Sequence, residues 1–271
     1  MLCELVNSVF GLPRVMVCVK YAINVDELKV DRESGRVITT GASRKTSDFD
    51  RNAVEEAVKL KEQGWEAVAV TVGDEQSKMA LREALAMGVD SVYLLTDERF
   101  KELDTLGTSY LLAKAAEKLK PDLILCGEAS IDSFSGQVGP RLAEWLGIPH
   151  IAYARSLRVD GDSVVVERGL EDRVEVVRAR MPVLVSVTRE INQPRTPSLM
   201  AIMKASRKEI AVWGVEELGV EVGELERLRG VEVVGVQAPR VERKAITIEG
   251  ETAREIAEQL VKALLKEGVL G

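Results

Sequence analysis

The fold of this chain is decided by the stretch Ala67-Val68-Ala69-Val70-Thr71-Val72-Gly73. Apart from Thr71, every residue before the glycine is apolar, so the stretch has no polar face that could lie against water. A strand of this kind must be covered on both sides, which is typical of a parallel sheet between two layers of helices. The residues that follow, Glu75–Met87, have helical spacing and stop before Gly88, a residue that favours the left-handed end of a helix.

The same alternation of apolar strand and amphipathic helix runs through the first 150 residues. We predict further strands at 15–19, 89–95 and 123–126, further helices at 52–62, 106–119 and 136–146, and a hairpin of 28–30 with 36–38. The fold class that this pattern predicts is α/β, with an open, doubly wound, mostly parallel sheet.

After Pro149 the pattern changes to short apolar runs without helical spacing. Strands are predicted at 156–159, 164–167, 174–178 and 183–187, and the tight turn Asp160-Gly161-Asp162 suggests that they pair antiparallel. Two more helices are predicted at 199–205 and 251–267, whereas residues 209–240 hold little that could bury itself. We therefore predict an α/β domain of residues 1–190, followed in 191–271 by a loop and an extended C-terminal arm ending in a helix. The apolar stripe of that helix docks either on the chain's own core or on another subunit.

The composition excludes several classes of function. With 37 Lys and Arg against 44 Asp and Glu, the net charge of −7 argues against nucleic-acid binding. No apolar run reaches the roughly 18 residues of a membrane span, and Met1–Phe10 makes a poor secretory signal. The cysteines at positions 3, 18 and 126 lack metal-ligand spacing, so we expect a reduced, cytoplasmic protein without a metal site. His150 is the single histidine, so we expect no catalytic side chain, and a cofactor would perform any chemistry.

The most informative turn is Gly127-Glu128-Ala129-Ser130-Ile131-Asp132-Ser133-Phe134-Ser135-Gly136-Gln137-Val138-Gly139. It leaves a buried strand and leads into a helix through small residues, whose free backbone N–H groups can hold an anion such as a phosphate. It matches neither the P-loop pattern nor the dinucleotide glycine pattern. The alternative is an ordinary turn in which Ser133 or Ser135 caps the helix, and Asp132 is expected to act as a cap or to accept a hydroxyl group.

Two groups of charged residues are expected to be solvated. Glu55 and Glu56 lie on the predicted helix 52–62. A basic patch lies beside the proline-containing loop Asn192–Pro197, and its alternative role is to face an acidic partner surface. The patch consists of Arg195, Lys204, Arg207 and Lys208.

Several stretches of the chain together resemble the beta subunits of electron transfer flavoproteins. The most specific match is Asn192-Gln193-Pro194-Arg195 followed by Ile202-Met203-Lys204-Ala205. The similarity extends from about Val15 to the C-terminus. The other matching stretches are Val17–Lys20, Ser47–Ala57, Ala84–Gly88, Gly127–Gly139 and Val166–Ser186.

This resemblance implies a Rossmann-like domain that binds an adenine nucleotide at the carboxyl edge of the sheet. It also implies a heterodimer with an alpha subunit that carries one FAD. In the common type of this family the beta-subunit nucleotide is a structural AMP. In the electron-bifurcating type it is a second FAD, which accepts hydride from NADH and splits the electrons. Electrons then pass to partner dehydrogenases or a quinone oxidoreductase, so any link to a membrane is indirect, through a partner.

The resemblance also assigns residues. The nucleotide would be lined by Cys18, Ser47, Asp48, Phe49, Asp50, Val72, Gly127, Glu128, Ala129, Ser130, Ile131, Asp132, Ser133, Phe134, Ser135, Gly136, Gln137 and Val138. A loop from Pro194 to Ala205 would recognise partner proteins, with Leu199 as an apolar anchor and Arg195 and Lys204 beside it.

The chain departs from the family pattern in three places. Ser47-Asp48 stands where Asn-Pro is frequent, and Arg173 where an acidic residue or glycine is usual. The run Gly136-Gln137-Val138-Gly139-Pro140 resembles the bifurcating type, since the AMP-binding type tends to have Asn-Gln-Thr there. Because Gly136 and Val138 offer no side-chain hydrogen bond to a terminal phosphate, backbone amides would hold the nucleotide, which favours the pyrophosphate of FAD over AMP. A free-standing adenine-nucleotide-binding protein and a structural subunit without ligand are the remaining alternatives.

Overall fold

The computed structural model describes residues 11–31, 33–101, 103–231, 233–239 and 244–270. The chain divides into two units, Met1–Lys29 with Ile38–Gly235 and Val30–Val37 with Val236–Gly271. The first unit holds the large sheet and the candidate site. The stretch 1–10, with Cys3, lies outside the described residues, so the expectation that it is no secretory signal stays a prediction.

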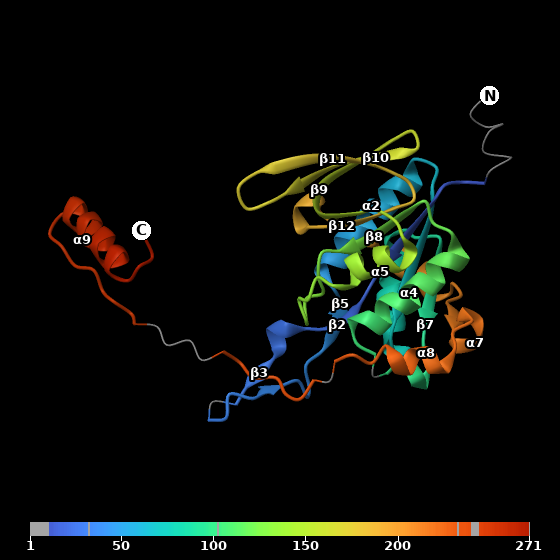
Figure 1. Ribbon diagram of the computed structural model, residues 1–271, viewed down its shortest axis with the longest axis horizontal. Helices are drawn as coiled ribbons and strands as arrows, with labels where there is room; N and C mark the ends of the chain where they lie inside the picture. Colours follow the sequence, from blue (N-terminus) through green and yellow to red (C-terminus); the bar gives the residue numbers. More distant parts are fainter. Residues whose placement is uncertain (1–10, 32, 102, 232, 240–243, 271) are drawn as a thin grey trace. The chain divides into compact units, whose positions relative to one another are not determined.

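One sheet of the first unit has nine strands, in the order β11-β10-β9-β12-β8-β1-β6-β7-β13 (Figure 1). From β9 to β13 in this order all strands run parallel, and β10 and β11 close the other edge in antiparallel pairing. The mostly parallel α/β fold is thereby confirmed. The strands are β1 (Arg14–Cys18), β6 (Glu66–Val72), β7 (Ser91–Leu95), β8 (Leu123–Gly127), β9 (His150–Asp160), β10 (Ser163–Gly169), β11 (Val174–Arg180), β12 (Val183–Val187) and β13 (Ala211–Trp213).

The predicted helices are present, with ends that differ by a few residues. In the first unit they are α2 (Asp48–Glu62), α3 (Lys78–Met87), α4 (Thr105–Leu119), α5 (Val138–Leu146) and α6 (Leu199–Ser206). Two short helices that were not predicted, α7 (Val215–Leu218) and α8 (Val222–Arg227), follow in the same unit. In the second unit α9 (Ala253–Lys266) has exposed Ile256, Leu260, Val261 and Leu265. Short strand pairs are β2 (Tyr21–Ile23) with β5 (Arg44–Thr46), and the expected hairpin β3 (Lys29–Val30) with β4 (Val37–Ile38). Within the described residues, no helix combines the length and the apolar character that crossing a bilayer requires.

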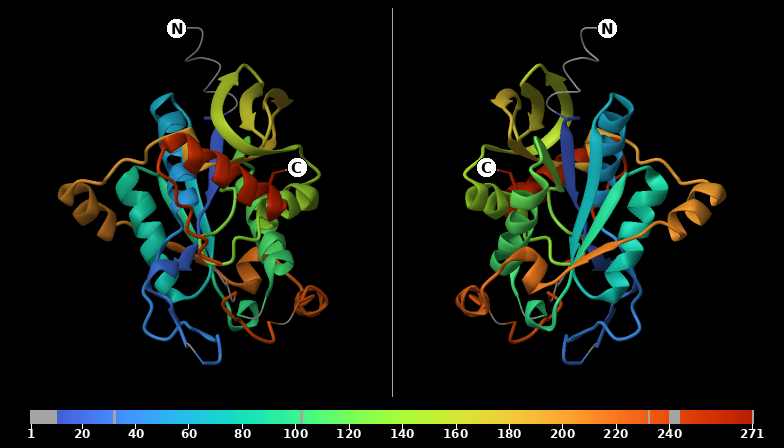
Figure 2. Two further views of the ribbon diagram at one scale, coloured as in Figure 1. Left: turned by 90° about the vertical axis from the view of Figure 1, so that its left-hand side faces the viewer. Right: turned by 90° about the vertical axis from the view of Figure 1, so that its right-hand side faces the viewer.

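Helices cover both faces of the sheet (Figure 2). The side chains of β1 alternate between these faces, as the two-residue repeat of a strand requires. Val15 and Val17 pack on the side of α2 and α3. Met16 and Cys18 pack on the side of α4 and α5. This explains why the central strands carry no polar side.

The strand order reverses between β1 and β8. After β1 the chain adds β6 and β7 on one side, and then places β8 on the other. In open parallel sheets, ligands bind beyond the carboxyl ends of the strands at such a reversal. The two carboxyl ends concerned are Cys18 of β1 and Gly127 of β8.

The expectation of antiparallel pairing was wrong for Val183–Val187. This segment, β12, lies between β8 and β9 and is parallel to both. All of its residues are buried, so it suits the interior of a parallel sheet. The strands β9, β10 and β11 do pair antiparallel, with the predicted turn after Asp160.

The expectation that residues 209–240 bury little was wrong for residues 209–228, whereas the described residues from 229 to 237 are exposed, as expected. β13 pairs with β7 at the edge of the large sheet. The short helices α7 and α8 bury Val215, Leu218 and Leu225. Each of these elements spans at most six residues, which is too short for a hydrophobic period to stand out in the sequence.

Candidate functional site

The buried carboxylate of Asp50 joins the ends of the two central strands. Asp50 lies in the first turn of α2 and is 7% exposed. Its Oδ2 accepts the N–H of Lys20, just after β1, at 2.8 Å, and its Oδ1 accepts the N–H of Gly127, the last residue of β8, at 3.2 Å. Burial raises the pKa of Asp50 to about 7, although both N–H bonds oppose this shift. The carboxylate thus fixes the edge of the sheet where its strand order reverses.

Gly127 has to be a glycine. A Cβ at this position would lie 2.5 Å from Oδ1 of Asp50 and 2.7 Å from Cβ of Phe49. The absence of a side chain lets the start of α2 approach the end of β8.

Asp132 holds the turn after β8 in shape. Its Oδ1 accepts the hydroxyl of Ser130 at 2.7 Å, the N–H of Ser133 at 2.8 Å and the ammonium of Lys20 at 2.7 Å. Burial alone would raise the pKa of Asp132, but the bonds from Lys20 and Ser130 outweigh it, and the pKa is lowered. The expectation that Asp132 accepts a hydroxyl is confirmed, and the pairing of Asp132 with Lys20 is a contact that the sequence did not predict.

The start of α5 presents backbone donors without partners. Among the described residues, no protein acceptor receives the N–H groups of residues 135–139. The residue before the helix, Gln137, makes no side-chain cap, and Gly136 has a φ of 62°. The alternative in which Ser133 or Ser135 caps the helix was therefore wrong. Unpaired N–H groups at the start of a helix bind anions, as the sequence predicts for this turn.

Two buried hydroxyl groups at this edge also lack partners. Ser47 precedes α2 and is fully buried, and Thr71 lies near the end of β6 and is 1% exposed. Within the described part of the chain, neither hydroxyl oxygen has a hydrogen-bond partner. Buried polar atoms are normally satisfied. Together with the open amides after β8, they fit a polar ligand at this edge of the sheet.

The outer rim of the site is aromatic and cationic. The rings of Phe49 and Phe134 lie 5.9 Å apart, and Phe134 is 66% exposed. The guanidinium of Arg189 lies 4.7 Å from the centre of the Phe49 ring and 3.1 Å from a carboxylate oxygen of Asp48. The sequence did not predict a role for Arg189 here, because Arg189 lies 141 residues after Asp48 in the chain.

Phe49 and Arg189 form a wall shared by two clefts. The larger, of about 640 Å³, is lined by Phe49, Glu128, Tyr153, Arg155, Gly169, Leu170, Asp172, Arg173, Val174, Thr188, Arg189 and Glu190. The smaller, of about 320 Å³, is lined by Val25, Asp26, Lys45, Asp48, Phe49, Ile131, Phe134 and Arg189. Tyr153 has a φ of 61°, which is strained for an aromatic residue and is typical of ligand sites. Burial raises the pKa of Glu128 in the larger cleft.

Most of the residues assigned from the sequence converge on this edge. Cys18, Ser47–Asp50 and Gly127–Val138 lie at the carboxyl ends of β1 and β8, and Val72 ends the neighbouring β6. The neighbouring thiol of Cys18 and burial together raise the pKa of Cys126. His150 begins β9, and its Nε2 hydrogen-bonds to the hydroxyl of Ser186.

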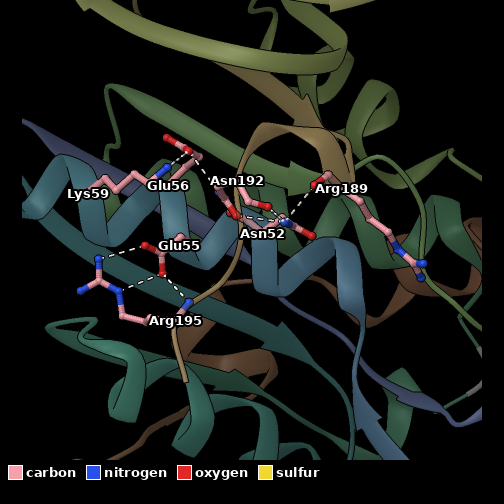
Figure 3. Close-up of polar contacts among 7 residues, drawn as sticks. All are labelled: Asn52, Glu55, Glu56, Lys59, Arg189, Asn192 and Arg195. Atoms are coloured by element: carbon pink, nitrogen blue, oxygen red, sulfur yellow. Dashed lines mark hydrogen bonds and ion pairs between the residues drawn. The ribbon is translucent and has the colours of Figure 1, made fainter. Parts of the chain in front are cut away.

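A second set of contacts fixes residues 189–195, called the strap below, along α2 (Figure 3). The backbone N–H, Nε and Nη2 of Arg195 donate to Glu55 at 2.8–3.0 Å, and its Nη1 donates to Glu62 at 2.8 Å. The amides of Asn52 and Asn192 bond to each other's backbone carbonyl at 2.8 and 2.9 Å. These contacts give the strap one register on α2, which means that each strap residue lies against a fixed position of the helix.

The expectation that Glu55 and Glu56 are solvated was wrong. They are 5% and 7% exposed. Glu55 is bound by Arg195, and Glu56 accepts from Lys59 at 2.7 Å and from Asn192 at 3.0 Å. Partners that are remote in the sequence make this burial possible, since buried carboxylates need paired donors.

Comparison with known proteins shows the family to which this chain belongs. A family model described as the electron transfer flavoprotein domain matches residues 34–218. The electron transfer flavoprotein subunit beta of Thermoanaerobacterium thermosaccharolyticum is 36% identical over 260 residues, which cover 94% of this chain and 99% of that one. The chain belongs to the electron transfer flavoprotein family, among its beta subunits. The resemblance noted in the sequence is confirmed at this level.

Two further relatives are similar to this chain. The electron transfer flavoprotein subunit beta of Megasphaera elsdenii is 41% identical over 205 residues, covering 72% of this chain and 76% of its own. Subunit CarD of the caffeyl-CoA reductase-Etf complex of Acetobacterium woodii is 33% identical over 262 residues, covering 95% and 100%. Most of the candidate site of this electron transfer flavoprotein beta subunit lies within residues 34–218, the range that the family model matches, whereas Cys18 and Lys20 precede this range.

The strap of this beta subunit leads into an exposed apolar helix. In α6, Leu199 is 73% and Met200 82% exposed, and Ile202 and Met203 are also exposed. Only the other side of α6 is held: Ala205 is buried, and Arg82 of α3 donates to the carbonyl of Ala205 at 2.6 Å. Of the predicted partner-binding residues, Leu199 and Lys204 are exposed, whereas Pro194 and Arg195 are partly buried against α2.

Proposed function

We propose that this beta subunit pairs with an electron transfer flavoprotein alpha subunit and binds FAD at the carboxyl edge of β1 and β8. It passes electrons from NADH towards the alpha-subunit FAD, and from there to a partner dehydrogenase or a quinone oxidoreductase. The observation that carries this proposal is the row of unpartnered N–H groups at residues 135–139, next to the tight approach at Gly127.

The residues at the edge fit an adenine dinucleotide. The N–H groups at the start of α5 would hold the pyrophosphate, because that helix end is positive and its donors are free. The unpaired hydroxyl of Ser47 would accept or donate a hydrogen bond to the adenylate part. Phe49 and Arg189 would contact the outer part of the cofactor. FAD, once bound, would supply the redox chemistry.

Two observations favour FAD over AMP. Gly136 and Val138 offer no side-chain donors to a terminal phosphate. Beyond the turn, the clefts on either side of Phe49 and Arg189 provide about 640 and 320 Å³, which a mononucleotide would leave unfilled. The relative CarD, named as part of a reductase-Etf complex, is consistent with a bifurcating subtype.

The exposed face of α6 fits a partner protein. Leu199, Met200 and Met203 form an apolar patch, and Lys204 and Arg207 lie beside it. An apolar anchor with a basic rim suits a pocket surrounded by acidic residues. We assign this face to the partner dehydrogenase.

Cofactor counting tests the proposal. The chain is co-expressed with its alpha subunit, the complex is extracted with acid, and FAD and AMP are counted per heterodimer. Two FAD molecules are the expected result. One FAD and one AMP would replace the bifurcating assignment by the simpler type, and absence of any nucleotide beyond the alpha-subunit FAD would refute nucleotide binding by this chain.

A further inference from the structure

One helix, α2, reaches both the candidate nucleotide site and the strap. The strap leads to α6, which is called the docking helix below because its exposed face is the proposed partner surface. Its first turn contains Phe49 and Asp50, which form the nucleotide edge. Its later turns contain Glu55 and Glu62, which hold Arg195. The strap lies against the same helix between these two points, and α6 starts four residues after it.

The two ends of the strap are held with unequal strength. At the far end, Arg195 makes its three bonds to the carboxylate of Glu55, whose side chain is only 7% exposed. At the near end, Arg189 is 57% exposed, and it is held by the 3.1 Å ion pair with Asp48 and by its stacking on Phe49. Exposed ion pairs of this kind contribute little stability. The near end is therefore the part of the strap that a ligand can change.

Arg189 is placed to meet an anionic ligand. It lines both clefts beside the nucleotide turn, and its guanidinium presents several donors to the larger one. An acceptor oxygen on the outer part of the bound nucleotide can take hydrogen bonds from this guanidinium and so competes directly with Asp48. The backbone after Arg189 cannot absorb such a change freely, because Asn52 holds the carbonyl of Asn192 in one register.

We propose that Arg189 and the strap couple the nucleotide site to α6: a bound nucleotide pins Arg189, and the strap, which already has one register on α2, transmits this restraint to the docking helix. This inference rests on the proposed function. Arg189 and Arg195 are positioning residues in it, acting on Leu199 and Met200 through the backbone. Because coupling between two sites is reciprocal, a partner bound at α6 tightens the nucleotide by the same factor.

Hydrogen exchange of the full-length chain tests the coupling, with AMP and FAD as the added probes and equilibrium dialysis as the measure of their binding. Peptides covering residues 196–206 are expected to exchange at least about fivefold more slowly when a nucleotide is bound, the lower end of typical couplings. In Arg189→Gln, compared at nucleotide concentrations that equilibrium dialysis shows to saturate the variant, the slowing is lost. In Arg195→Gln these peptides exchange fast with and without nucleotide.

The matched control is Arg207→Gln, which removes a cation just after α6. Arg207 makes no hydrogen bond or ion pair with the described residues of α2, so this variant should retain the slowing. Nucleotide binding without any change in residues 196–206 would overturn the coupling and leave the proposed function standing. Slowing that persists in Arg189→Gln would overturn the role of Arg189. Failure of both nucleotides to bind would refute the proposed function, and the coupling with it.

Discussion

Glu55 and Arg195 lie 140 residues apart in the sequence, and the carboxylate of one receives three hydrogen bonds from the other. The acceptor is almost fully buried on α2, and the donor is the last residue of the strap. Neither would be stable in this position alone, because an unpaired buried charge is costly. The pair therefore decides where the segment leading to the docking helix lies.

Breaking this pair should destabilise the chain. For Arg195→Gln we expect a loss of about 2 kcal/mol in the free energy of unfolding, less than for a fully buried pair, because the arginine side chain is still 36% exposed. Urea unfolding measures it. The double variant Glu55→Gln/Arg195→Gln should recover part of the loss, and Arg180→Gln, with its side chain 87% exposed, serves as control. Additive effects of the two single changes would show that the pair is not coupled.

The stability of the chain should depend on the ionisation of Asp50. Its pKa is about 7 in the folded state against an ordinary value of 3.8, so the folded state favours the protonated form. The stabilisation is complete below about pH 4 and is lost as the pH rises towards 7. We expect the free energy of unfolding to fall more steeply over this window in the native chain than in Asp50→Asn. Parallel pH profiles of the two proteins in urea unfolding would contradict the burial argument.

A methyl group at Gly127 should expel the nucleotide. In Gly127→Ala the new Cβ would overlap Oδ1 of Asp50 at 2.5 Å, which forces the first turn of α2 away from β8. We expect nucleotide content per purified chain to drop at least about tenfold, equivalent to 1.4 kcal/mol. Circular dichroism checks that the variant is folded.

The control for Gly127→Ala is Gly223→Ala in α8, where a Cβ would meet no atom within 4 Å. It should retain full nucleotide content and normal helix signal. Full occupancy in Gly127→Ala would mean that the nucleotide binds elsewhere.

Docking through α6 should depend on Leu199. In Leu199→Gln we expect the KM for the partner dehydrogenase to rise about tenfold, because an apolar anchor of an interface contributes more than 1 kcal/mol, while kcat changes little. Steady-state reduction of the partner by the alpha–beta complex measures both constants. Met79→Gln on α3 replaces a comparably exposed apolar residue, 59% against 73%, and should leave KM unchanged. An equal effect of both changes would argue against a specific docking face.

Much of the fold could be predicted, because a nearly continuous apolar strand such as Ala67–Val72 has to lie in a sheet that is covered on both faces. The parallel position of Val183–Val187 could not, since strand direction depends on which neighbours are available in space and not on the strand's own pattern. Short elements such as β13 and α7 were missed because three or four residues carry no period.

The candidate site divides in the same way. The turn after β8 is visible in the sequence as a local cluster of small residues. The sequence does not reveal the contacts of Lys20 and Arg189 or the pairing of Glu55 with Arg195. Each of these contacts joins residues that lie 110 or more positions apart in the chain. Charged residues on a helix face are usually solvated, and only tertiary structure shows which of them are buried and paired.

The central claim is that backbone amides at the start of α5 hold an adenine nucleotide. Electron density for the co-purified alpha–beta complex tests it most directly. The account predicts phosphate oxygens within hydrogen-bond distance of the N–H groups of residues 135–139, with the adenylate between Ser47 and Gly127. A turn whose amides are closed by protein atoms or water alone, with every nucleotide of the complex bound elsewhere, would contradict it.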